Sequence, residues 1–132
     1  MPIADIMTRK LITISPDLAI SELQPMFKQF RVHHLLVVEE GRLVGVVSDR
    51  DVLRNVSPFV HTTAEDKKDS FTLTRKAHQI MSTQLVTVES TMGIRDACER
   101  LLNGGVSLLP IEENGKLVGV VSWRDMLRYF IR

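Results

Sequence analysis

The sequence predicts an α/β protein (of the α+β type) in which one β-α-β-β-α unit occurs twice in tandem. Gly45-Val46-Val47-Ser48 recurs as Gly119-Val120-Val121-Ser122, and 19 of the 52 residues at 3–54 are identical to the residue 74 positions later. In each copy, short β-branched runs alternate with segments of helical periodicity, and a glycine turn separates two apolar runs. The duplication therefore organises every element that follows.

Each copy is expected to begin with a short strand and an amphipathic helix. The β-branched residues at 12–14 and 86–88 are typical of strands. The spacing i, i+3, i+7 then predicts one buried helical face per copy, at Ile20, Leu23 and Phe27 and at Ile94, Ala97 and Leu101. Gly104-Gly105 is expected to end the second helix. Pro25 predicts either a kink in the first helix or a helix that starts late.

A hairpin and a closing helix are expected next. Residues 34–38 and 43–47 flank Glu40-Gly41, and residues 108–111 and 117–121 flank Asn114-Gly115, a strong hairpin signal. Residues 50–55 and 124–130 are expected to form the closing helices. So small a sheet cannot cover both of its faces alone, so the two units are predicted to pack as a pseudo-two-fold pair in one module.

The expected organisation is a first repeat at 1–56, a linker at 57–76 and a second repeat at 77–132. The linker is polar and lacks core periodicity, with room for one helical turn. Its basic residues alternate with acidic ones, which indicates solvated charge rather than a nucleic-acid patch.

The bulk composition excludes several classes of protein. The 132 residues carry a formal net charge of +1 and only 5% aromatic residues, which argues against nucleic-acid binding. The apolar runs are too short to cross a bilayer, and the first residues lack the pattern of a signal peptide. Cys98 is the single cysteine, so no intrachain disulfide or multi-thiolate metal site is expected. We therefore expect a cytoplasmic protein without nucleic-acid or membrane partners.

The residues that can carry chemistry lie where the second hairpin strand ends, and each copy there reads Gly-Val-Val-Ser-x-Arg-Asp. One interpretation is a capping box, in which Ser48 and Asp51, or Ser122 and Asp125, satisfy free amides at a helix start. The other is a nucleoside phosphate site. The helix start and the serine suit a phosphate, the aspartate suits ribose hydroxyls, and the glycine lets another group approach closely. Both interpretations stay open.

The chain resembles a tandem pair of cystathionine-β-synthase (CBS) domains, also called a Bateman module, over residues 5–130. The resemblance rests on the repeated Gly-x-x-Ser-x-x-Asp motif, on Ile6-Met7 and Ile80-Met81, and on Val32-His33-His34-Leu35. It implies a regulatory module that binds an adenosine compound (AMP, ADP, ATP or S-adenosylmethionine) in clefts between the repeats. It also implies a homodimer that requires no cofactor, whose change of shape or association a separate effector protein can read.

The same resemblance assigns residues to two clefts, each combining the motif of one repeat with the segment before the first strand of the other. The first would use Ser48, Arg50 and Asp51, with His33 and His34 near the phosphates and Thr83, Gln84 and Leu85 around the base. The second would use Ser122, Arg124 and Asp125, with Arg9, Lys10 and Leu11 at the base. Ser107 and Leu108 replace the histidines in the second copy and bring no positive charge. The first cleft is therefore expected to be the better phosphate site, and the second to be empty or to hold an uncharged nucleoside.

The histidines, Cys98 and Trp123 each carry alternative interpretations. His33 and His34 are adjacent on a strand, where side chains alternate between faces, so a shared metal ion is not expected. Cys98 is expected to be a core residue rather than a nucleophile. Trp123 can either pack on the linker or anchor a dimer.

No nucleophile–base pair is evident in the sequence, so no enzyme is expected. The alternative function is a ligand-free interaction or dimerisation scaffold in which both motifs only cap helices. A third alternative is an enzyme with its active site at a dimer cleft.

Overall fold

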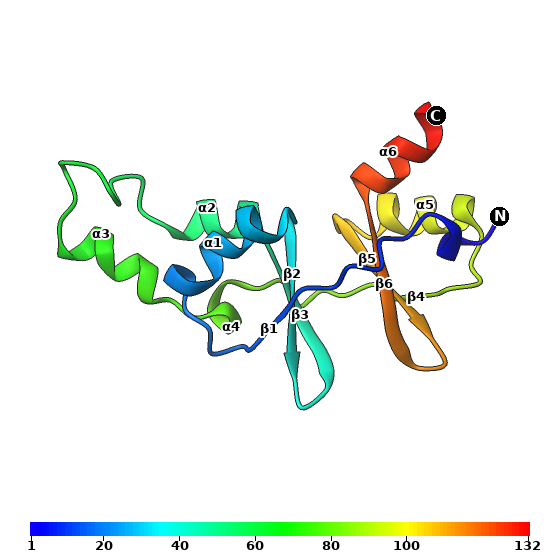
Figure 1. The fold of residues 1–132 in the computed structure, drawn as a ribbon, viewed down its shortest axis with the longest axis horizontal. Helices are drawn as coiled ribbons and strands as arrows, with labels where there is room; N and C mark the ends of the chain where they lie inside the picture. Colours follow the sequence, from blue (N-terminus) through cyan, green and yellow to red (C-terminus); the bar gives the residue numbers. More distant parts are fainter. The chain divides into compact units, whose positions relative to one another are not determined.

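The computed structural model describes all residues, 1–132, and forms two compact units (Figure 1). The terminal unit consists of Met1–Leu11 and Gln84–Arg132, and the middle unit consists of Ile12–Thr83. Each unit contains a three-stranded mixed sheet with helices. The predicted α/β class and the repeated β-α-β-β-α order are confirmed.

In the middle unit, β1 (Thr13–Ile14) pairs in parallel with β2 (His34–Glu39), which pairs antiparallel with β3 (Arg42–Ser48). Helix α1 (Ile20–Phe30) connects the parallel pair, and β3 runs directly into α2 (Asp49–Asn55). The two helices contact each other (Figure 1). Their apolar faces and one face of the sheet form the core, with Ile14, Ile20, Leu23, Leu35, Val37, Val47 and Val52.

The terminal unit repeats this topology. Strand β4 (Val88–Glu89) pairs in parallel with β5 (Leu108–Glu113), which pairs antiparallel with β6 (Lys116–Ser122). Helix α5 (Ile94–Asn103) connects β4 to β5, and β6 runs into α6 (Trp123–Ile131). Its core contains Val88, Ile94, Ala97, Leu101, Leu109, Ile111, Val121 and Met126.

Both hairpins close through two-residue turns, as the glycine signal predicts. Glu40 and Gly41 have φ values of 51° and 77°, and Asn114 and Gly115 have 54° and 77°. Positive φ at both central residues is the requirement of the type I′ turn, whose twist matches that of the flanking strands.

Helix α1 begins at Ile20 and continues through Pro25, so it does not start late. Pro25 removes one backbone donor from the helix. The residue is exposed, so water can bond the carbonyl group left without its helical partner.

The segment expected as a linker holds more helix than a single turn. Helix α3 (Lys67–Phe71) and the 3-10 turn η2 (Thr72–Thr74) occupy its second half, and α4 (Ala77–Ile80) follows. Asp66 and Asp69 form a capping box at α3, and Ser57 Oγ donates to Asp69 Oδ1 at 2.5 Å. That hydroxyl, followed by the backbone N–H of Asp66, holds the pKa of the Asp69 carboxyl below its usual value. Capping side chains rather than a periodic apolar face therefore stabilise this helix.

Each unit contains the opening segment of the other repeat. In the terminal unit the Thr8 N–H donates to the Val120 carbonyl at 2.8 Å, and the Val120 N–H donates to the Thr8 carbonyl at 2.9 Å. In the middle unit Ser82 and Val46 form the matching pair of bonds, at 2.9 and 3.0 Å. These bridges attach an opening segment to the strand that carries each Ser/Asp motif.

Gly45 and Gly119 make room for this attachment. A Cβ at Gly119 would lie 2.6 Å from Sδ of Met7 and 2.9 Å from the carbonyl oxygen of Thr8. A Cβ at Gly45 would lie 2.8 Å from Cγ of Met81. The close approach expected at these glycines is thus made by the methionine of an opening segment.

Gly119→Ala is expected to lower the free energy of unfolding by about 1–3 kcal/mol, because the added methyl overpacks against backbone that cannot retreat without breaking the Thr8–Val120 bridge. Urea denaturation measures this loss. Gly93→Ala is the comparison without overpacking, since the nearest atom to its Cβ would be 3.9 Å away, and its loss should not exceed the cost of about 1 kcal/mol for an alanine at the N-cap of α5. A Gly119→Ala chain as stable as its parent would contradict the packing role.

Candidate functional site

The first Ser/Asp motif occupies the junction between β3 and α2. The Ser48 N–H donates to Asp51 Oδ2 at 2.8 Å, and the Asp51 N–H donates to Ser48 Oγ at 3.1 Å. These two bonds form the predicted capping box. The hydroxyl proton of Ser48 and the second carboxylate oxygen of Asp51, Oδ1, have no protein partner.

The second motif forms the same cap between β6 and α6. The Ser122 N–H donates to Asp125 Oδ2 at 2.9 Å, and the Asp125 N–H donates to Ser122 Oγ at 3.4 Å. Here the protein also occupies the second oxygen, because the Thr8 hydroxyl donates to Asp125 Oδ1 at 3.1 Å. The two copies therefore form the same cap, but the second carboxylate oxygen, Oδ1, is available in Asp51 and already accepts a hydrogen bond in Asp125.

His33 and His34 lie beside the first motif, as predicted. The pairing of β2 with β3 places His34 opposite Ser48, and the Asp49 N–H donates to the carbonyl of His33 at 3.1 Å. The His33 ring is itself paired, with Nδ1 2.8 Å from Asp49 Oδ2 and side-chain exposures of 46% and 42%. A protonated His33 would therefore already be paired with the Asp49 carboxylate. Sequence reasoning missed this residue, because Trp123 stands at its position in the second copy.

The remaining predicted residues divide between the units. The middle unit holds Arg50 and Thr83 with the first motif, and the terminal unit holds Gln84 and Leu85. The terminal unit holds every residue assigned to the second cleft: Arg9, Lys10, Leu11, Ser122, Arg124 and Asp125. Arg9, Arg50 and Arg124 are exposed. The assignment of these residues to a ligand stays a prediction.

Thr8 is a second residue that sequence reasoning missed. It precedes Arg9 in the opening segment, and its bridge to Val120 brings its side chain to the carboxylate of Asp125. The partners are 117 positions apart. The one available signal was the position of Thr8 immediately after the Ile-Met pair of the repeat.

Three further observations concern metal ions, the Cys98 thiol and the membrane. No cluster of three or more His, Cys, Asp or Glu side chains that could hold a metal ion occurs. The Cys98 thiol contacts Sδ of Met126 at 3.2 Å, and burial raises its pKa, which disfavours the nucleophilic thiolate. None of the helices is long and apolar enough to span a bilayer.

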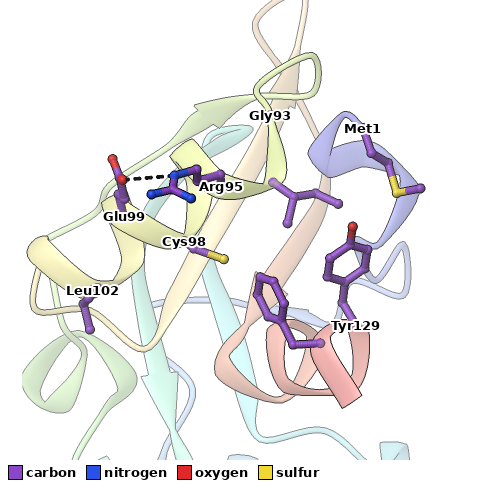
Figure 2. Close-up of a pocket in the computed structure, with 9 residues that line it drawn as sticks. Met1, Gly93, Arg95, Cys98, Glu99, Leu102 and Tyr129 are labelled. Carbon is purple, nitrogen blue, oxygen red and sulfur yellow. Dashed lines mark ion pairs between the residues drawn. The ribbon is translucent and has the colours of Figure 1, made fainter. Parts of the chain in front are cut away.

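A groove of about 520 Å³ lies on the terminal unit, away from both motifs (Figure 2). Arg95 and Glu99 form an ion pair of 3.7 Å there, and both side chains are well exposed. The groove is lined by Met1, Gly93, Ile94, Arg95, Cys98, Glu99, Leu102, Tyr129 and Phe130. None of the predicted binding residues is among them.

Helix α6 exposes an apolar stripe beside this groove. Trp123, Leu127, Phe130 and Ile131 share one helical face and are 43%, 58%, 63% and 80% exposed. The opposite side of the helix supplies Met126 and Tyr129 to the core. Exposed apolar faces of this kind mark interaction surfaces.

Known proteins share this sequence pattern. The family model described as "CBS domain" matches residues 3–58 and 77–132. The CBS domain-containing protein YhcV of Bacillus subtilis is 32% identical over 124 residues, which cover 94% of this chain and 81% of that protein.

Solved structures share the fold. The CBS domain pair of protein MJ0100, in complex with 5′-methylthioadenosine and S-adenosyl-L-methionine, superposes with a TM-score of 0.78 at 20% identity, covering 98% of this chain and 95% of that one. CBSX2 in complex with AMP superposes with a TM-score of 0.76 at 25% identity, covering 98% and 96% of the two chains.

Ser48→Ala is expected to lower the free energy of unfolding by about 1 kcal/mol, because the side-chain acceptor for the Asp51 N–H is lost. Urea denaturation again measures the change. Ser48→Asp is the control, since aspartate is an equally good N-cap and should restore most of the stability. Equal losses in both variants would contradict a capping role.

Proposed function

The chain belongs to the CBS domain family, and we propose that it is a regulatory module that binds an adenosine compound. The ligands in the two complexed relatives, AMP in one and S-adenosylmethionine with 5′-methylthioadenosine in the other, have an adenosine group in common. AMP, ADP, ATP and S-adenosylmethionine are accordingly the candidate ligands here, and no further cofactor is needed.

The open carboxylate oxygen of Asp51 is the observation that carries this proposal. A ribose presents two neighbouring hydroxyl donors, and an ionised carboxylate accepts hydrogen bonds at both oxygens. Asp51 uses Oδ2 for the cap and keeps Oδ1 available. Hydrogen bonds to a charged acceptor contribute about 1.5–3 kcal/mol each.

A phosphate on the same ligand would find donors beside Asp51. The Ser48 hydroxyl proton is available, the Arg50 side chain is exposed, and His33 and His34 lie across the strand pair. The second repeat has no histidine at the matching positions. We therefore place the preferred nucleotide site at the first motif.

Signalling requires that the ligand bind one state of the protein more tightly than another. In the proposed mechanism, occupancy of the first motif changes conformation or self-association, and a separate effector protein reads the change. The chain performs no catalytic step in this scheme. Release of phosphate from ATP by the purified protein would contradict that part of the proposal.

Asp51→Asn is expected to weaken AMP binding by about 10–100-fold, since the amide group lacks the charged acceptor while its oxygen can still cap α2. Isothermal titration calorimetry gives the affinity. Asp125→Asn is the matched control in the other motif and should leave this affinity unchanged. If Asp51→Asn binds AMP as tightly as the parent chain, the ribose contact is refuted.

A ligand-free scaffold remains the second candidate function, because both motifs form complete capping boxes and α6 exposes an apolar stripe. The same stripe is the surface we propose for a homodimer. It includes Trp123, for which anchoring a dimer was one of the two alternatives.

Phe130→Asp is expected to convert a dimer of the parent chain into a monomer, since it places a charge in the middle of the apolar stripe. Light scattering coupled to size exclusion measures the mass. Phe71→Asp removes a similarly exposed phenyl ring from α3 and should leave the mass unaltered. A monomeric parent chain would rule out the homodimer.

A further inference from the structure

The two Ser/Asp motifs differ in how fully the protein occupies their carboxylates. An ionised carboxylate offers about four lone-pair positions. In Asp125, Oδ2 accepts from the N–H and the hydroxyl of Ser122 at 2.9 and 3.2 Å. Oδ1 accepts from the Thr8 hydroxyl at 3.1 Å and lies 3.5 Å from an Arg128 guanidinium nitrogen. The side chain is only 10% exposed. The carboxylate therefore accepts three protein hydrogen bonds, and both of its oxygens have a protein partner.

Asp51 has one such partner. Its Oδ2 accepts from the Ser48 N–H at 2.8 Å, and its Oδ1 accepts from no protein group. Arg54 stands at the position that corresponds to Arg128 but forms no ion pair with Asp51. The difference arises although the two caps and the two backbone bridges are built alike.

The source of the difference is the residue that follows the Ile-Met pair, Thr8 in one copy and Ser82 in the other. Each residue forms two backbone hydrogen bonds with the strand that precedes the neighbouring Ser/Asp motif, Thr8 with Val120 and Ser82 with Val46. Thr8 is half-buried and its hydroxyl points at Asp125, whereas Ser82 is exposed and its hydroxyl makes no bond to Asp51. The branched Cβ of threonine restricts χ1. A threonine therefore loses less rotamer freedom than a serine when its hydroxyl donates to the carboxylate.

We propose that Thr8 is a specificity-determining residue that closes the second motif to a ribose. A ribose hydroxyl that approaches Asp125 Oδ1 must compete with the Thr8 hydroxyl and the nearby Arg128 guanidinium, and replacing the Thr8 bond gains no hydrogen bond. The chain accordingly binds one adenosine ligand, at Asp51. This inference rests on the proposed function. In it, the motif of the first repeat binds the ligand, and the motif of the second repeat only caps its helix.

Calorimetric titration of the full chain with AMP, and separately with adenosine, tests the proposal. The parent chain is expected to bind one ligand per chain. Thr8→Val, which has the same shape without the hydroxyl, is expected to bind a second ligand with an affinity at least about tenfold above that of the parent's second motif. Adenosine tests this motif without a phosphate, for which the second repeat lacks the histidines.

Two further variants show where the second ligand binds and whether misfolding accounts for the gain. Adding Asp125→Asn to Thr8→Val should abolish the second event and leave the first unchanged. Thr8→Ala, which also lacks the hydroxyl, should reproduce the gain of Thr8→Val, and both variants should unfold in one cooperative transition like the parent.

The outcomes separate the two proposals. Two equal sites in the parent chain, or a single site in both Thr8→Val and Thr8→Ala, would overturn the role of Thr8 and leave the Asp51 site intact. Absence of binding in every variant would overturn the proposed function, and the role of Thr8 would fall with it.

Discussion

Two backbone bridges position the Ser/Asp motifs, one between Thr8 and Val120 in the terminal unit and one between Ser82 and Val46 in the middle unit. Each bridge ties the opening segment of one repeat to the strand that ends in the Ser/Asp motif of the other. The glycine in that strand is required because a methionine of the opening segment fills the space of its missing side chain. The motif and the Ile-Met pair therefore belong to one packing unit, although they come from different repeats.

The same attachment explains how two similar motifs acquire different chemistry. Because an opening segment lies against each motif, the residue after its methionine decides what the aspartate can still accept. Threonine at position 8 occupies Asp125, and serine at position 82 leaves Asp51 open. A capping box and a ligand site are thus compatible at Asp51, where the cap uses one carboxylate oxygen and the second oxygen remains for a ligand.

Much of the fold could be predicted because its signals are local and occur twice. The hairpin turns at Gly41 and Gly115 need a positive φ that glycine supplies, and the Ser/Asp caps span only three residues. Helix α3 was less predictable because capping at Asp66 and Asp69 replaces apolar periodicity. The Thr8–Asp125 bond joins residues 117 positions apart, and the His33–Asp49 pair has no counterpart in the second copy. Neither contact could be read from the repeat.

A titration of the ¹⁵N-labelled chain with AMP, followed by the backbone amide signals in NMR spectra, shows directly whether the nucleotide binds at Asp51. Binding at Asp51 is expected to give saturable shifts centred on Ser48, Asp51 and His33, and much smaller shifts at Ser122 and Asp125. Spectra that do not change, or shifts confined to the groove around Cys98 and Tyr129, would contradict it.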